Sequence, residues 1–169
     1  DDKGNLKKDA YEIASYASEI SSENGGNVNA LCFNASNAES LSNYGVDKII
    51  NSKNEELKNF DPSNYSKCIT EVFNNEECNL LVLSSSSNSK HIGGILSVLT
   101  DSSYVTNVIS KLTNGEKMTV VRNTFTNKAF ETVEINKNKI ILAISKNSFG
   151  LKEKPVKSEF VETNFNIPE

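Results

Sequence analysis

The sequence predicts an α/β fold with a mostly parallel sheet, helices on both of its faces, and an antiparallel excursion at one side. Expected helices and strands alternate over the first 100 residues, whereas strands dominate afterwards. Residues 80–83 form a continuous apolar run, which is typical of a strand covered on both faces in a parallel sheet. The length of 169 residues suits one such domain with a short tail.

The amino-terminal part contains the clearest helical period. Apolar residues at positions 10, 13, 14, 17 and 20 predict an amphipathic helix over residues 7–23, and the Gly25-Gly26 pair ends it. A later helix is expected to begin at Pro62, with Asp61 as its cap. The segments between these helices are expected to be a strand over 28–33, a turn and short helix over 34–43, and a strand over 46–50.

Residues 79–99 are the stretch around which the chain is organised. The strand 80–83 runs into a serine tract that ends it, and apolar residues then return at helical spacing. Ser87, Asn88 or Ser89 is the expected helix cap. Ligands of open α/β sheets bind at such loops, so Ser84 to Ser89 is the place to look for a site. The alternative is a solvated turn whose hydroxyls bond to its own backbone.

Extended segments dominate the rest of the chain. They are expected over 104–112, 117–126, 129–135 and 139–144, with a tight turn at 126–128. Residues 151–169 show no period and are expected to form a linker or arm. Its apolar residues are either contacts for a partner or missing domain, or parts of a floppy tail; they are Phe160, Val161, Phe165 and Ile167.

The first expected helix begins almost at the start of the sequence. A doubly wound sheet normally places a strand before its first helix. We therefore expect the first strand of the sheet to be missing from this sequence.

Composition narrows the classes of function. The net charge of −4 argues against nucleic acid, whose binders carry a basic stripe. No apolar run approaches the ~20 residues of a membrane span, and no secretory signal opens the chain. The three cysteines are expected to be buried free thiols in a reducing compartment; they are Cys32, Cys68 and Cys78. Without a CxxC motif or a second histidine, a metal site is not expected.

Chemical motifs are mostly absent. Neither GxGxxG nor GxxxxGK[ST] occurs, and the Gly93-Gly94 pair serves either close helix packing or approach to a phosphate. His91 is expected on a helix face, with a general base as the alternative. Arg122, the only arginine, is expected either to make a directed ion pair or interface contact, or to be simply exposed. We therefore assign no catalytic, cofactor-binding or metal residue.

Several segments are informative as an ordered set. Residues 7–12 precede the Gly25-Gly26 pair, and further segments follow at 44–49, 81–99, 103–108, 122–129 and 144–149. In this order they resemble the amino-terminal domain of the electron transfer flavoprotein α subunit, over about residues 1–150. The segment from Arg122 to Ala129 resembles the family's arg-x-x-x-x-gly-lys-ala, with Asn127 in place of the glycine. Ser89-Lys90-His91 stands where the family often has Gly-Arg-Asp.

This resemblance implies an adenine-nucleotide α-hydrolase-like, Rossmann-like fold. It also implies that residues 151–169 lead to a carboxy-terminal domain that holds FAD and is not in this sequence. No FAD is then expected in this chain, which would be a non-enzymatic scaffold of an electron carrier. The implied partners are the β subunit and acyl-CoA or other flavin dehydrogenases, in a bacterial cytoplasm or a mitochondrial matrix.

Two other functions remain open at this point. One is a stand-alone adenine-nucleotide-binding module of the universal-stress-protein type, with the loop Ser84 to Ser89 at the phosphate. The sequence lacks that family's spaced glycines. The other is a small hydrolase of similar fold, for which no nucleophile and base can be identified.

Overall fold

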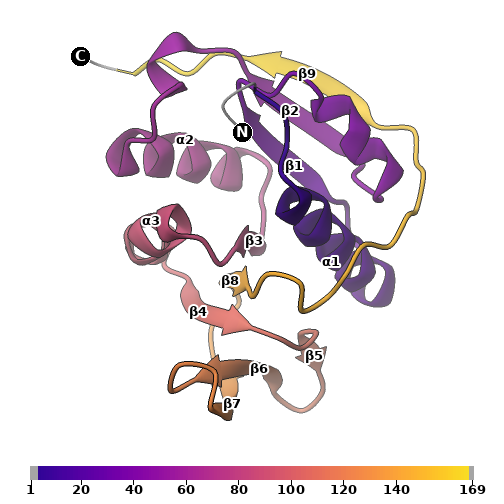
Figure 1. Cartoon of the computed structure of the whole chain (residues 1–169), viewed down its shortest axis with the longest axis vertical. Coiled ribbons are helices and arrows are strands. Elements are labelled where there is room, and N and C mark those ends of the chain that lie inside the picture. The colour runs from indigo at the N-terminus through magenta and orange to yellow at the C-terminus, as the bar shows by residue number, and fades with distance from the viewer. Residues whose placement is uncertain (1–3, 168–169) are drawn as a thin grey trace. The chain divides into compact units, whose positions relative to one another are not determined.

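The computed structural model describes residues 4–167, and the chain divides into two compact units (Figure 1). The first unit comprises residues 1–68 and 150–169, and the second comprises residues 69–149. Each unit has its own sheet, one wholly parallel and one mixed. The α/β class, the parallel strands and the antiparallel excursion are confirmed, although the expected strands fall into two sheets instead of one.

The first unit is built on a three-stranded parallel sheet in the order β1-β2-β9. Leu31 of β1 lies opposite Ile50 of β2, which lies opposite Val161 of β9. The elements of this unit are α1 (Lys8–Asn24), β1 (Asn29–Phe33), η1 (Ala38–Asn43), β2 (Lys48–Ser52), η2 (Glu55–Leu57) and β9 (Glu159–Thr163).

Helix α1 supplies part of the core of this unit. Ala14 belongs to a buried cluster with Val28, Cys32 and Ile49, which is the apolar face that the helical period predicted. The helix ends at Gly25, whose φ of 80° lies in the region that glycine adopts without strain. The Gly25 amide donates to the Ser21 carbonyl over 2.8 Å, so the expected stop is confirmed.

The expectation that residues 151–169 lack regular structure is wrong for Glu159–Thr163. This segment forms β9 and pairs in parallel along the whole length of β2. The chain reaches it along α1 and η1, because the amides of Lys152 and Lys154 donate to Ser15 Oγ and the Asn43 carbonyl. Phe165, just beyond β9, is buried. A strand partner so distant in sequence leaves no local period, which is why the pattern did not reveal it. A linker to a further domain stays a prediction.

The second unit contains a six-stranded mixed sheet in the order β3-β8-β4-β6-β5, with β7 paired to β6. Strands β3, β8 and β4 are mutually parallel, and β6 joins them antiparallel. Helix α2 (Pro62–Asn75) crosses from the first unit into the second. The other elements are β3 (Leu80–Ser84), α3 (Ser87–Leu99), β4 (Ser103–Val108), β5 (Thr113–Asn114), β6 (Met118–Thr124), β7 (Ala129–Ile135) and β8 (Ile140–Ile144).

Two turns decide where the elements of the second unit begin and end. The hairpin β6–β7 reverses at Phe125, Thr126 and Asn127, all with positive φ, one residue earlier than expected. Helix α3 starts at Ser87 with Ser86 as its cap, so the expected caps were placed too late. At the start of α2, by contrast, the Asn64 amide donates to Asp61 Oδ1 over 2.8 Å, and the predicted cap is confirmed.

Gly93 lets α3 pack directly against β4. A β-carbon at Gly93 would overlap the ring of Tyr104, whereas one at Gly94 would meet open space. Of the two roles considered for this pair, close packing therefore holds at Gly93.

We predict that Gly93→Ala lowers the free energy of unfolding by about 1–3 kcal/mol, because the added methyl group overpacks the contact with Tyr104. The matched control Gly94→Ala should raise it by roughly 0.5–1 kcal/mol, since alanine favours an exposed helical position. Urea unfolding measures both. Equal changes in the two variants would contradict the role of Gly93.

Candidate functional site

The serine loop between β3 and α3 bonds to itself and to its own sheet. The Ser86 amide donates to Ser89 Oγ over 2.8 Å, and the Ser89 amide donates back to Ser86 Oγ over 3.2 Å. This capping box leaves Ser89 buried. Ser85 Oγ donates to the Ala143 carbonyl over 3.1 Å and accepts from the Asn107 amide over 3.3 Å. Of the two alternatives, the self-bonded turn describes the loop, and its hydroxyls do not favour a phosphate site.

Asparagines close the carboxyl end of the parallel sheet in the first unit. The side chain of Asn51 accepts from the Ala35 amide (3.2 Å) and donates to its carbonyl (2.8 Å). Asn34 and Asn54 are joined by two similar bonds, and Asn54 also donates to the Phe165 carbonyl over 3.1 Å. Ligands often bind at this end of an α/β sheet. Here the amides hold loops together instead. Sequence reasoning did not single them out, although Asn34 directly follows the predicted strand 28–33.

Burial lowers the reactivity of two of the cysteines, Cys32 and Cys78. None of the three cysteines forms a disulfide, and Cys32 and Cys68 are buried, as expected, whereas Cys78 is half-buried. Burial raises the pKa of the Cys32 thiol to about 11, and burial also raises the pKa of Cys78. A thiol that stays protonated at neutral pH is a poor nucleophile and metal ligand. Within residues 4–167, no group of three His, Cys, Asp or Glu side chains could hold a metal ion.

Arg122 makes an ion pair with Glu131, although the pair lacks the directed hydrogen-bond geometry that was expected. It lies opposite Glu131 in the β6–β7 register, and its Nε is 3.3 Å from Glu131 Oε2. The pair has no hydrogen-bond alignment, because this buried Nε lacks a hydrogen-bond acceptor in the described chain. His91 lies on the exposed side of α3, as predicted. His91 is therefore a surface residue, whereas Arg122 is half-buried.

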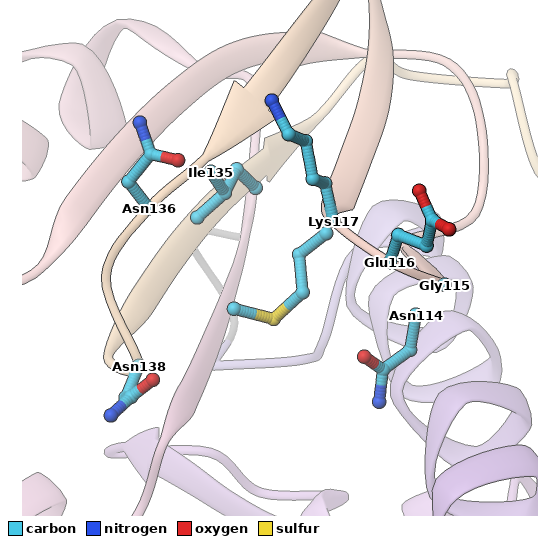
Figure 2. A pocket seen from close by; sticks show the side chains of 8 residues that line it. Asn114, Gly115, Glu116, Lys117, Ile135, Asn136 and Asn138 are labelled. Atoms are coloured by element: carbon cyan, nitrogen blue, oxygen red, sulfur yellow. The ribbon is translucent and has the colours of Figure 1, made fainter.

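A hollow of about 390 Å³ lies beside the β5–β6 turn (Figure 2). Figure 2 shows that its side chains come from the β5–β6 turn with the adjoining strand ends, and from the end of β7 with the segment that follows it. They include the amides of Asn114, Asn136 and Asn138, and Lys117, which is paired with Glu134 over 2.8 Å. Because its polar groups are exposed and its lysine is paired, we assign no chemistry to this hollow.

The second unit also exposes apolar side chains, and these say more about its contacts than the polar hollow does. At the tip of the β6–β7 hairpin, the side chains of Phe125 and Phe130 are 84% and 74% exposed. On α3, Val98 is 80% exposed and lies at helical spacing from the exposed Ile95. Exposed apolar groups of this kind mark contact surfaces. We refer to the first as the hairpin tip (Phe125 and Phe130) and to the second as the α3 face (Ile95, Val98 and Leu99).

A model of the electron transfer flavoprotein domain family matches residues 1–164. The chain belongs to this family. The match confirms the resemblance to electron transfer flavoproteins, and it runs through β9. The family places the chain in electron transport, where its domains act as carriers in company with other family subunits and flavin dehydrogenases. No curated protein matches the chain.

Membrane insertion through a helix is not a feature of this electron transfer flavoprotein domain as described. Every helix within residues 4–167 is too short or too polar to cross a bilayer.

We predict that Ser89→Ala lowers the free energy of unfolding by about 1–2 kcal/mol, because it removes one half of the capping box and leaves buried partners unbonded. The neighbouring exposed Ser87 provides the matched control, and Ser87→Ala should change stability by less than about 0.5 kcal/mol. Thermal or urea unfolding measures the difference. If Ser89→Ala lowered the free energy of unfolding no more than Ser87→Ala does, the capping box would not be what stabilises this loop.

We predict that Cys32 contributes to alkaline destabilisation. Its pKa is about 11 in the folded chain against a usual 9.0, so the folded state holds this proton more tightly than the unfolded state does. The full free energy of unfolding is therefore present below pH 9, and it falls as the pH rises towards 11. The loss amounts to at most about 3 kcal/mol, because the shift is about two pKa units. Cys32→Ala should therefore flatten the fall of unfolding free energy above about pH 9.

The comparison variant is Cys78→Ala, whose thiol also has a pKa raised by burial but is only half-buried. It leaves the Cys32 thiol in place and should therefore retain most of the alkaline fall. Parallel pH profiles for wild type and Cys32→Ala would contradict the prediction.

Proposed function

We propose that this chain is the amino-terminal domain of an electron transfer flavoprotein α subunit and serves as a scaffold of that carrier. The observation that carries the proposal is the family match over residues 1–164. FAD would be held by a carboxy-terminal domain that follows residue 169. The complete protein would pass electrons from acyl-CoA or other flavin dehydrogenases, in a bacterial cytoplasm or a mitochondrial matrix.

The assignment to the α subunit rests on the segment from Arg122 to Ala129. It resembles the family's arg-x-x-x-x-gly-lys-ala, in which Asn127 replaces the glycine. Asn127 has a φ of 63°, in the left-handed region that glycine and asparagine adopt most readily. The conformation of Asn127 is therefore one that a glycine at this position would adopt without strain. Arg122 on β6 and Glu131 on β7 form an ion pair across the same hairpin.

The hairpin tip is the surface that we propose for the β subunit. Two phenylalanines this exposed would each bury a large apolar area on contact, and aromatic side chains are frequent anchors of interfaces. The turn between the two strands passes through Phe125, Thr126 and Asn127, all with positive φ.

Binding of the purified β subunit from the same source tests this proposal. We predict that Phe125→Ser with Phe130→Ser raises the Kd by about 10- to 100-fold, equivalent to about 1.4–2.8 kcal/mol. The matched control is Phe160→Ser, which changes an exposed phenylalanine on β9 and should leave the Kd within about twofold.

The negative results of this experiment distinguish the scaffold role from the proposed contact at the hairpin tip. Failure of the wild-type chain to bind the β subunit would overturn the scaffold role, and so would stoichiometric flavin absorbance of the purified chain. Unchanged binding by the hairpin variant would overturn only the proposed contact.

A further inference from the structure

The sequence contains two asparagine–glycine pairs, and the structure gives them opposite surroundings. They are Asn24-Gly25 and Asn114-Gly115. Asparagine is a thermolabile residue, because the backbone nitrogen of the next residue can attack its side-chain carbonyl carbon. A following glycine leaves that nitrogen unshielded, since glycine has no β-carbon. In a folded chain, the reaction then depends on how freely these two groups can meet.

The first pair is held at the end of α1. The Asn24 side-chain amide donates to the Ile20 carbonyl over 3.0 Å, and the Gly25 amide donates to the Ser21 carbonyl over 2.8 Å. Both reacting groups are thus bonded to the last turn of the helix. Attack requires the glycine nitrogen to give up its proton and turn towards the side chain, so both hydrogen bonds must break first.

The second pair lies in the turn between β5 and β6, in the wall of the hollow drawn in Figure 2. All residues over 113–117 are exposed. A β-carbon built on Gly115 would meet no atom within 4 Å beyond its chain neighbours. Within residues 4–167, the Gly115 amide donates no hydrogen bond. Because β5 has only two residues, the turn can change shape without opening the core.

We propose that Asn114 is a site of spontaneous deamidation, whereas Asn24 is protected by the fold. The Gly115 nitrogen forms a bond to Asn114 Cγ, and the side-chain nitrogen leaves as ammonia together with the proton of the Gly115 amide. The product is a five-membered succinimide ring. Water then opens the ring at either of its carbonyl carbons, which gives aspartate or isoaspartate. The reaction uses solvent water and needs no ligand in the hollow.

The modification changes both the charge and the backbone of this turn. Either product replaces an amide in the wall of the hollow by a carboxylate, two residues from Glu116. Isoaspartate also adds a methylene group to the main chain at the residue that pairs with Met118 of β6. Since residue 114 lies outside the buried core, we expect the fold to persist after the reaction.

Peptide mapping of the chain after incubation at mildly alkaline pH tests the proposal. Cleavage after lysine places the two asparagines on separate peptides, residues 9–48 and 112–117, and fragmentation in the mass spectrometer assigns the modified residue. We expect Asn114 to deamidate about tenfold or more faster than Asn24 in the folded chain, because the helix end must open before Asn24 reacts. In concentrated urea the two rates should agree within about threefold, because the fold no longer distinguishes the sites.

The matched variant is Gly115→Ala. Gly115 is not among the glycines with positive φ, and the space around its β-carbon position is open, so alanine fits without strain. Its methyl group shields the attacking nitrogen and should slow deamidation of Asn114 by about tenfold or more.

Two results would overturn the proposal. One is an equal rate of deamidation at Asn24 and Asn114 in the folded chain, because the turn would then protect its asparagine as well as the helix end does. The other is an unchanged rate at Asn114 in the Gly115→Ala variant, because attack by the Gly115 nitrogen would then not limit the loss of the amide.

Discussion

The hydrogen bonding of β8 on both of its edges holds the second unit together. All five residues of Ile140–Ile144 are buried, and the strand pairs in parallel with β3 on one side and β4 on the other. The bonding continues past the strand ends, where the Ser85 amide donates to the Ile144 carbonyl and the Ser145 amide to that of Val108, each over 2.8 Å. The serine loop follows β3, and the β6–β7 hairpin is attached through β4. The positions of the serine loop and of the β6–β7 hairpin therefore both depend on β8.

Polar side chains in this domain mainly stabilise loops. Ser86 and Ser89 cap α3, and Asn51 and Asn54 hold the loops at the carboxyl end of the parallel sheet. Each of these groups would need a replacement partner if a ligand took its place, and a buried polar group left unbonded costs about 1–3 kcal/mol. Many α/β proteins bind nucleotides at these strand ends. In this domain, the polar side chains there stabilise the loops instead.

Two exposed surfaces of the second unit are apolar. The hairpin tip and the α3 face present hydrophobic side chains that the described chain leaves partly or largely uncovered. Such surfaces are typical of a domain that works within a larger assembly. They fit a member of a family whose domains operate beside other subunits.

The sequence by itself determined the elements whose signals are local. The period of α1, the cap at Asp61, the apolar run of β3 and the β6–β7 reversal near Asn127 all depend on residues within one or two turns of each other. Tertiary structure alone decided the incorporation of β9 beside β2, the ion pair of Arg122 with Glu131, and the contact of Gly93 with Tyr104. It also decided that the strands form two sheets. These outcomes depend on which distant segments share hydrogen bonds and volume, and a local pattern of residues does not encode that choice.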